Sequence, residues 1–156
     1  MSINKPENES QKLDKFANKS KSKPLQFQHH LHKAVFKKNQ LPSYFIFYPT
    51  SRCNLMCSHC FYHDSLNKKM NELNLDEIDA FTKTMDPLLS LILTGGEPYL
   101  RHDLDQIVRI FYENTKIPMV TIPSNGWYLE KMLKQIRNFM NWYPDLILNQ
   151  LISLDG

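Results

Sequence analysis

The stretch Tyr44–Cys60 reads YFIFYPTSRCNLMCSHC and decides how the rest of the chain is interpreted. It opens with the dense aromatic and β-branched run Tyr44–Tyr48, a composition that predicts a buried strand. The run passes directly into a short loop that carries the chain's three cysteines, Cys53, Cys57 and Cys60. The sequence therefore predicts a strand that leads straight into a loop rich in potential metal ligands.

The spacing Cys-x3-Cys-x2-Cys indicates metal ligation by reduced thiols. An odd number of clustered cysteines argues against a disulfide framework and favours a reducing, cytoplasmic location. One interpretation is a zinc site in which His63 completes a Cys3His tetrahedron. A second is an iron–sulfur cluster with three protein thiolates and one open iron position. Three cysteines without a metal are the weakest interpretation, and the spacing alone leaves zinc and cluster open.

Hydrophobic patterns after the cysteine loop predict helices alternating with strands. The first helix begins with Asn74 as N-cap and Glu77 at the third helical position, the pattern of a capping box. The expected helices are Asn74–Met85, Asp103–Glu113 and Trp127–Tyr143, and the expected further strands are Leu88–Leu93, Pro118–Ile122 and Leu146–Leu154. Apolar strands alternating with helices predict an α/β fold with a parallel sheet and right-handed crossovers.

Each predicted strand is followed by a polar or glycine-bearing motif. Gly95-Gly96-Glu97-Pro98 follows the second strand, Ser124-Asn125-Gly126 the third and Ser153-Leu154-Asp155-Gly156 the fourth. Because parallel strands end at one edge of the sheet, these motifs and the cysteine loop are expected to meet there. A zinc-binding loop does not need the other three motifs, so their presence favours a cofactor site.

These motifs together resemble those of the radical S-adenosylmethionine (radical SAM) enzymes, from about Tyr44 to Gly156. The cysteine motif matches the family's signature, and Gly95–Pro98 matches its second-strand motif. The resemblance implies a partial (β/α)6 TIM-like barrel, of which this chain supplies about four parallel strands and ends after the fourth. The flanks of the cysteine motif, Tyr48–Arg52 and Phe61-Tyr62, resemble the branch of peptide maturases and molybdenum-cofactor biosynthesis protein A.

The resemblance implies two cofactors. Cys53, Cys57 and Cys60 would each bind one iron of a [4Fe-4S] cluster, and S-adenosylmethionine would chelate the fourth. Reductive cleavage of S-adenosylmethionine would give a 5′-deoxyadenosyl radical that abstracts hydrogen from the substrate, and no catalytic side chain is identified. The implied partners are a reductant such as flavodoxin or ferredoxin and an unknown substrate, with a peptide as one candidate.

The resemblance also implies where S-adenosylmethionine contacts the chain. Absent Cβ atoms would let the glycine backbone approach the methionine moiety, and the Glu97 carboxylate would lie near its ammonium group. Polar side chains of the last two motifs would reach the carboxylate or ribose, and a ring before the third cysteine would reach the adenine. The expected contacts are Gly95, Gly96, Glu97, Ser124, Asn125, Ser153, Asp155 and His59, the last in place of the family's usual Tyr, Phe or Trp.

Composition sets the expected domain organisation of the 156 residues. We expect a disordered basic tail over 1–24, a leading helix and linker over 25–43, and an incomplete core domain over 44–156.

Residues 1–40 hold nine Lys and three acidic residues, whereas the remainder is net acidic. Aromatic residues are not interleaved with the lysines of this tail, so a nucleic-acid partner is not expected. No apolar run reaches the roughly 18–20 residues of a membrane span, so no membrane contact is expected.

Two alternative functions remain open at this point. The first is a non-catalytic zinc- or cluster-binding module that uses Cys53, Cys57, Cys60 and His63. The second is a degenerate, truncated paralogue that binds the cluster and does no chemistry. Full metal content in a His63→Ala variant would count against the first alternative, and formation of 5′-deoxyadenosine under strong reductant would exclude the second.

Overall fold

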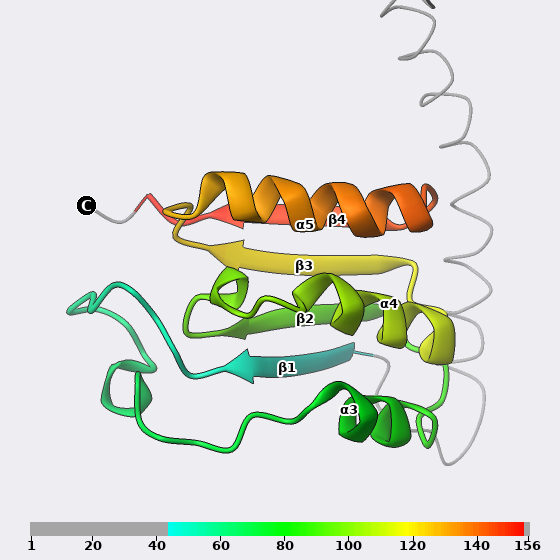
Figure 1. The fold of residues 1–156 in the computed structure, drawn as a ribbon, viewed down its shortest axis with the longest axis horizontal. Coiled ribbons are helices and arrows are strands. Elements are labelled where there is room, and N and C mark those ends of the chain that lie inside the picture. Colours follow the sequence, from blue (N-terminus) through cyan, green and yellow to red (C-terminus); the bar gives the residue numbers. More distant parts are fainter. Residues whose placement is uncertain (1–43, 155–156) are drawn as a thin grey trace, which may run out of the picture.

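The computed structural model describes residues 44–154 and shows one parallel sheet of four strands. The strands are β1 (Tyr44–Thr50), β2 (Ser90–Gly95), β3 (Met119–Ser124) and β4 (Ile147–Ile152). They lie side by side in chain order, and every neighbouring pair is parallel (Figure 1). The α/β class, the four strands and their parallel direction are confirmed. The tail expected over 1–24 and the helix and linker expected over 25–43 lie outside the described residues.

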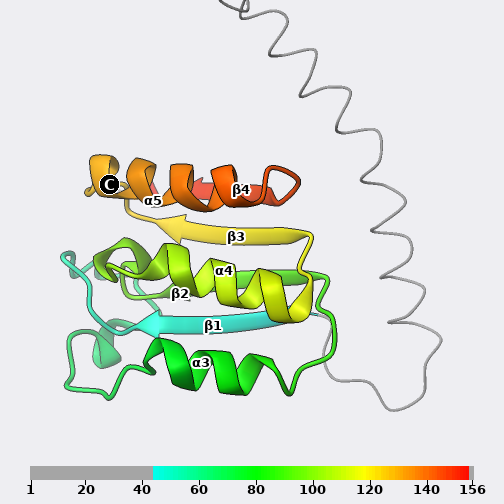
Figure 2. The ribbon, with the colours of Figure 1, turned by 45° about the vertical axis from the view of Figure 1, so that its right-hand side comes forward.

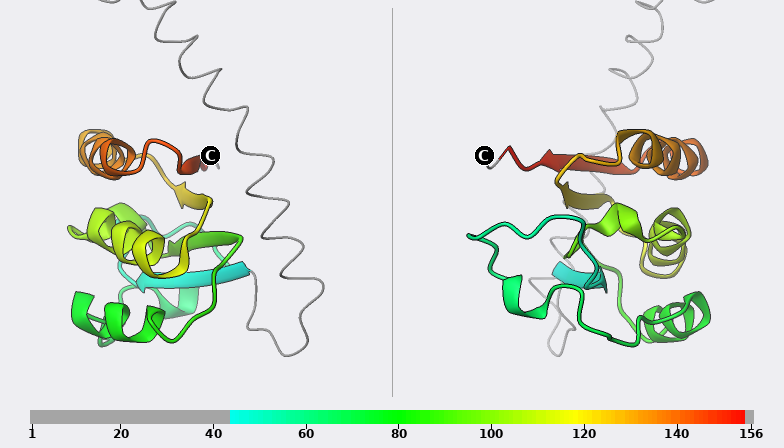
Figure 3. Two further views of the ribbon diagram at one scale, coloured as in Figure 1. Left: turned by 90° about the vertical axis from the view of Figure 1, so that its right-hand side faces the viewer. Right: turned by 60° about the vertical axis from the view of Figure 1, so that its left-hand side comes forward.

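Three helices connect the strands, and all of them cover the same face of the sheet. They are α3 (Leu75–Thr82), α4 (Leu104–Thr115) and α5 (Leu129–Trp142), and two short 3-10 turns, η2 (His63–Ser65) and η3 (Pro98–Leu100), lie in the loops. Figure 2 shows the helices stacked in the same order as the strands, and Figure 3 shows them on one side of the sheet. No helix in residues 44–154 combines the length and apolar composition that a bilayer-spanning segment needs.

A local sequence signal fixes where α3 begins. The Asn74 side chain accepts from the Glu77 amide at 2.9 Å, and the Glu77 carboxylate accepts from the Asn74 amide at 2.8 Å. The predicted capping box is therefore confirmed, and it satisfies two of the amide donors that a helix start leaves open. Helix α4 ends at Lys116, which takes a left-handed conformation with φ of 55°.

The hydrophobic core lies between the sheet and the helices. Phe45 and Phe47 of β1 pack against Phe111 of α4, with ring centroids 5.9 and 5.7 Å apart. The fully buried members of the core come from β2, β3, α3, α4 and α5 and include Ile78, Leu91, Leu93, Leu104, Ile107, Phe111, Val120, Ile122 and Phe139. This single layer of helices anchors the strands, so that their carboxyl ends form a fixed edge.

The opposite face of the sheet is left uncovered by the helices. Tyr44, Ile46 and Tyr48 are 56%, 53% and 42% exposed, so the prediction that Tyr44–Tyr48 is buried as a whole was wrong. Side chains of a strand alternate between faces, and only the face toward the helices is covered here. Phe61, directly after the third cysteine, is 79% exposed.

Candidate functional site

A cavity of about 240 Å³ lies at the carboxyl edge of the sheet, between the cysteine loop and the exits of β2, β3 and β4. The cysteine loop leaves β1 at this edge and folds over the ends of β2 and β3 (Figure 1). The lining includes Cys53, Cys57, His59, Cys60, Gly95, Gly96, Glu97, Ser124, Asn125 and Ser153. These are all of the predicted site residues except Asp155, which lies outside the described residues. Two larger hollows, of about 700 and 510 Å³, border the segment 67–77 and contain none of the cysteines.

Four lining residues were not predicted from the sequence: Leu55, Phe61, Thr94 and Pro123. Thr94 and Pro123 directly precede the strand-end motifs, and their half-exposed side chains belong to the uncovered face of the sheet. Strand alternation is the signal that identifies them once the covered face is known. Ser153 also lines the cavity and is held beside Ser124, because its amide donates to the Ser124 carbonyl at 2.9 Å.

The glycine pair holds the β2 exit against the start of the cysteine loop. Gly96 N donates to Thr50 O at 3.0 Å, and Glu97 N donates to Arg52 O at 2.8 Å. A Cβ on Gly95 would lie 2.5 Å from Thr50 O, and one on Gly96 would lie 2.1 Å from Arg52 O. Gly95 also has φ of +120°, which side chains rarely permit. The observed reason for the glycines is thus the close approach of two protein segments.

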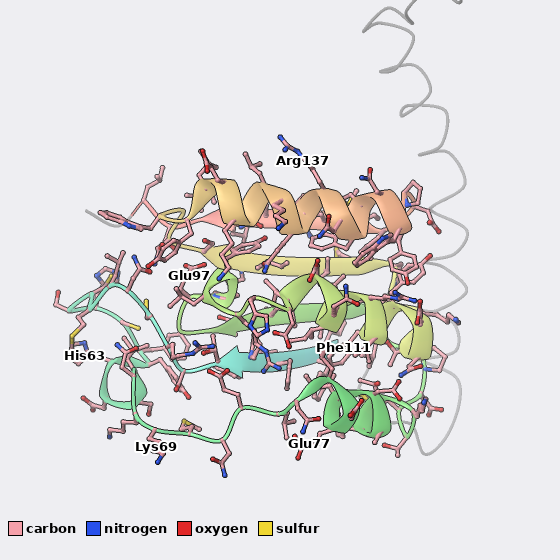
Figure 4. The ribbon with its side chains drawn as sticks, in the orientation of Figure 1. His63, Lys69, Glu77, Glu97, Phe111 and Arg137 are labelled. Carbon is pink, nitrogen blue, oxygen red and sulfur yellow. The ribbon has the colours of Figure 1, made fainter. Side chains whose placement is uncertain are left out.

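Glu97 joins the exits of β2 and β3. It is 2% exposed and lies at the cavity end of the sheet (Figure 4). Its Oε1 accepts from the Ser124 hydroxyl at 2.9 Å and from the Tyr99 amide at 3.2 Å. Its Oε2 accepts from the Asn125 amide at 2.8 Å. The resemblance implied that this carboxylate lies near an ammonium group, and its hydrogen bonds in the structure bind the protein's own strand ends together.

Cys53 is the most firmly held of the three cysteines. Its amide donates to Asn67 Oδ1 at 3.0 Å, and its carbonyl accepts from Asn67 Nδ2 at 3.1 Å. The Leu55 amide donates to its sulfur at 3.4 Å. Burial raises the pKa of the Cys53 thiol above its ordinary value; the Leu55 amide opposes this, and the negative charges of Glu97 and the other two thiolates add to it. Asn67 was missed by the sequence analysis, because nothing local marks a contact 14 residues away.

The donor set fits an iron–sulfur cluster. All three cysteines are free thiols, and all three line the same cavity. Within residues 44–154, no three His, Cys, Asp or Glu side chains converge on a point that could hold a single metal ion. The His63 ring, expected as a zinc ligand in one alternative, contacts the Cys57 carbonyl at 3.3 Å through Nδ1.

A parallel α/β sheet with three thiols and glycine-rich turns at its carboxyl edge defines a cofactor-dependent enzyme core. The model of the Radical SAM superfamily matches residues 47–147, more than half of the chain. This chain therefore belongs to the radical SAM superfamily of enzymes, whose members generally use S-adenosylmethionine, a [4Fe-4S] cluster and a reductant. The sheet corresponds to four strands of that family's partial barrel.

The relatives that the chain resembles include several GTP 3′,8-cyclases. The chain is 33% identical over 93 residues to that of Helicobacter pylori (strain ATCC 700392 / 26695), covering 57% of this chain and 29% of the relative. The enzymes of Aliarcobacter butzleri and Listeria monocytogenes serotype 4b are 29% and 34% identical over 93 residues, covering 57% of this chain and 29% and 28% of their own lengths. The predicted branch, that of molybdenum-cofactor biosynthesis protein A, is confirmed. The chain spans less than a third of each relative.

Proposed function

We propose that this chain binds a [4Fe-4S] cluster through Cys53, Cys57 and Cys60, with S-adenosylmethionine beside it, and serves as the N-terminal part of a radical SAM enzyme. The observation that carries the proposal is the single cavity at the strand ends, lined by the three thiols and by residues of the motifs after β2, β3 and β4. Family membership supports it independently. We place residues 44–156 in this incomplete core domain.

When bound, the cluster and S-adenosylmethionine supply one-electron chemistry that ends in hydrogen-atom abstraction from a substrate. The chain's own residues hold and orient these groups. Gly95 and Gly96 keep the β2 exit in contact with the cysteine loop, and Glu97 fixes Ser124 and Asn125 at the cavity wall. Ser124, Asn125, Ser153 and Asp155 would contact the methionine or ribose part of S-adenosylmethionine, and His59 its adenine.

The relatives point to the first substrate to test. Their names state that they cyclise GTP, and we propose GTP as the first candidate for the full-length enzyme that contains this chain. A peptide substrate stays a prediction that no observation here tests. The proposed electron donor is a low-potential carrier such as flavodoxin or ferredoxin, and the proposed location is the cytoplasm.

Anaerobic reconstitution with iron and sulfide tests the cofactor assignment. We expect a brown protein with about four iron atoms per chain and an EPR signal on reduction that changes when S-adenosylmethionine is added. Replacing Cys53, Cys57 or Cys60 with Ala should abolish iron uptake, because each thiolate is assigned to a different iron. A colourless protein that binds one zinc ion tightly would contradict the proposal.

His63→Ala is the matched control for the zinc alternative. A Cys3His zinc site would lose a ligand and most of its metal, whereas the proposed cluster should load to the wild-type level. Formation of 5′-deoxyadenosine under strong reductant would exclude the degenerate, non-catalytic alternative. The same assay with GTP on the full-length enzyme tests the substrate.

A further inference from the structure

Cys53 is the cysteine that the surrounding loops hold from two sides, each through an asparagine. Asn67 pairs with its backbone amide and carbonyl at 3.0 and 3.1 Å. Asn125 approaches from the β3 exit, 72 residues along the chain, and its Nδ2 lies 3.9 Å from Cys53 Sγ. The two asparagines therefore act on different atoms of one residue.

The Asn125 side chain is held in place at every polar position. The backbone N–H of Asn125 donates to Glu97 Oε2 at 2.8 Å, and the side-chain Oδ1 accepts from the Trp127 amide at 3.0 Å. Its Nδ2 also donates to Asn54 Oδ1 at 3.0 Å. Because Oδ1 is occupied by an N–H donor, the carboxamide can only present its NH2 group toward the cysteine loop. The donor that faces Cys53 Sγ is thus set by the surrounding hydrogen bonds.

Glu97 closes this arrangement into a ring. Its backbone amide donates to Arg52 O at 2.8 Å, next to Cys53 in the chain, while its carboxylate holds Asn125. The ring links the cysteine loop, the β2 exit and the β3 exit, so a shift of any one of them moves the donor relative to the sulfur. Such a ring of hydrogen bonds can fix the position of the Asn125 side chain relative to Cys53, which residues close in sequence cannot do.

We propose that Asn125 is a positioning residue that donates an N–H···S hydrogen bond to the Cys53 thiolate and thereby raises the reduction potential of the cluster. The inference rests on the proposed function, because it assigns a role toward the cluster held by Cys53. Hydrogen bonds to ligand sulfurs stabilise the more negative, reduced state of an iron–sulfur cluster. At 3.9 Å the bond is weak, so the effect is modest.

The test is the reduction potential of the reconstituted cluster, measured by anaerobic redox titration with EPR detection. Asn125→Ala removes the donor without adding charge. At a fixed potential it should lower the ratio of reduced to oxidised cluster about threefold, a shift of about 28 mV toward negative values for a one-electron couple. Asn125→Asp keeps the acceptor for the Trp127 amide but loses the donor and adds a negative charge, so its shift should be larger in the same direction.

Asn67→Gly is the matched control. It frees the backbone of Cys53 but keeps a residue that tolerates the φ of 57° at this position. Because the N–H donor of Asn125 is retained, its potential should shift less than that of Asn125→Ala, although the loop is loosened. A second readout, hydrogen exchange of residues 53–60 in the metal-free chain, should be accelerated by both Asn125→Ala and Asn67→Gly.

The outcomes separate this inference from the proposed function. An unchanged potential in Asn125→Ala, or an equal shift in Asn67→Gly, would overturn it. If the wild-type chain takes up no cluster, the proposed function fails. Hydrogen exchange of the metal-free chain then tests the positioning role of Asn125. Unchanged exchange over residues 53–60 in Asn125→Ala would then overturn it, and exchange faster than in wild type would support the part of it that places Asn125 against the cysteine loop.

Discussion

Replacing Gly96 with Ala should destabilise the fold by forcing the cysteine loop away from the β2 exit. The added Cβ would lie 2.1 Å from Arg52 O, whereas real Cβ contacts stay above 3.0 Å, so the segments must separate by about 3.0 − 2.1 = 0.9 Å. The separation weakens the backbone hydrogen bonds from Gly96 to Thr50 and from Glu97 to Arg52, each worth about 0.5–1.5 kcal/mol. With the lost packing, the free energy of unfolding should fall by about 2–3 kcal/mol.

Thermal and urea unfolding of the metal-free chain measure this loss. At roughly 3–5 °C per kcal/mol for a domain of this size, Tm should fall by about 6–15 °C. Gly126→Ala is the control: Gly126 has φ of +72°, but its Cβ would meet only the two side-chain methyls of Ile152, at 3.3 and 3.9 Å. That substitution should cost about 1–2 kcal/mol from backbone strain alone. The reasoning is refuted if Gly96→Ala costs no more than Gly126→Ala.

Three further changes test other parts of the fold. Burial tends to raise the pKa of Asp103, but the hydrogen bond and charge of buried Arg101 outweigh it and hold that pKa below its ordinary value. The ion pair therefore stabilises the fold above about pH 4, and this stabilisation is lost as the pH falls through the lower folded pKa. Asp103→Asn should lower the free energy of unfolding by about 3 kcal/mol at pH 7. The difference from wild type should shrink in urea titrations run below pH 4. Asn74→Ala should lower the free energy of unfolding by about 1 kcal/mol in urea, because it removes the N-cap of α3; an unchanged midpoint would contradict this. In residues 44–154, β4 pairs only with β3, and Leu151 is 53% exposed. The isolated chain should therefore self-associate, as measured by light scattering, and Leu151→Lys should reduce that association. A monomeric wild-type chain would show this expectation to be wrong.

Local sequence was sufficient for the elements and for most of the site. Alternating apolar segments predicted the strands, and the capping box at Asn74 predicted the start of α3, because both signals depend on residues within a few positions of each other. The cysteine spacing and the motifs after β2, β3 and β4 could be placed at one edge, since parallel strands share the edge at which they end. The radical SAM family membership followed from these motifs and is confirmed by the match over residues 47–147.

Contacts between distant segments could be decided only by the tertiary structure. Both faces of β1 carry aromatic residues, so the sequence did not indicate that the helices cover only one face. The exposure of Tyr44, Ile46 and Tyr48 was therefore not predicted. The role of Glu97 as a link between strand exits depends on Ser124 and Asn125, 27 and 28 residues away.

What the sequence by itself determined is therefore the class of fold, the order of the strands' motifs and the identity of the thiols. The tertiary structure decided which atoms hold those thiols in place. Asn67 and Asn125 reach Cys53 from 14 and 72 residues along the chain, a distance over which no periodic or local pattern carries information. Chain crossovers bring these side chains together, and only the packed sheet fixes how far each of them lies from the cysteine.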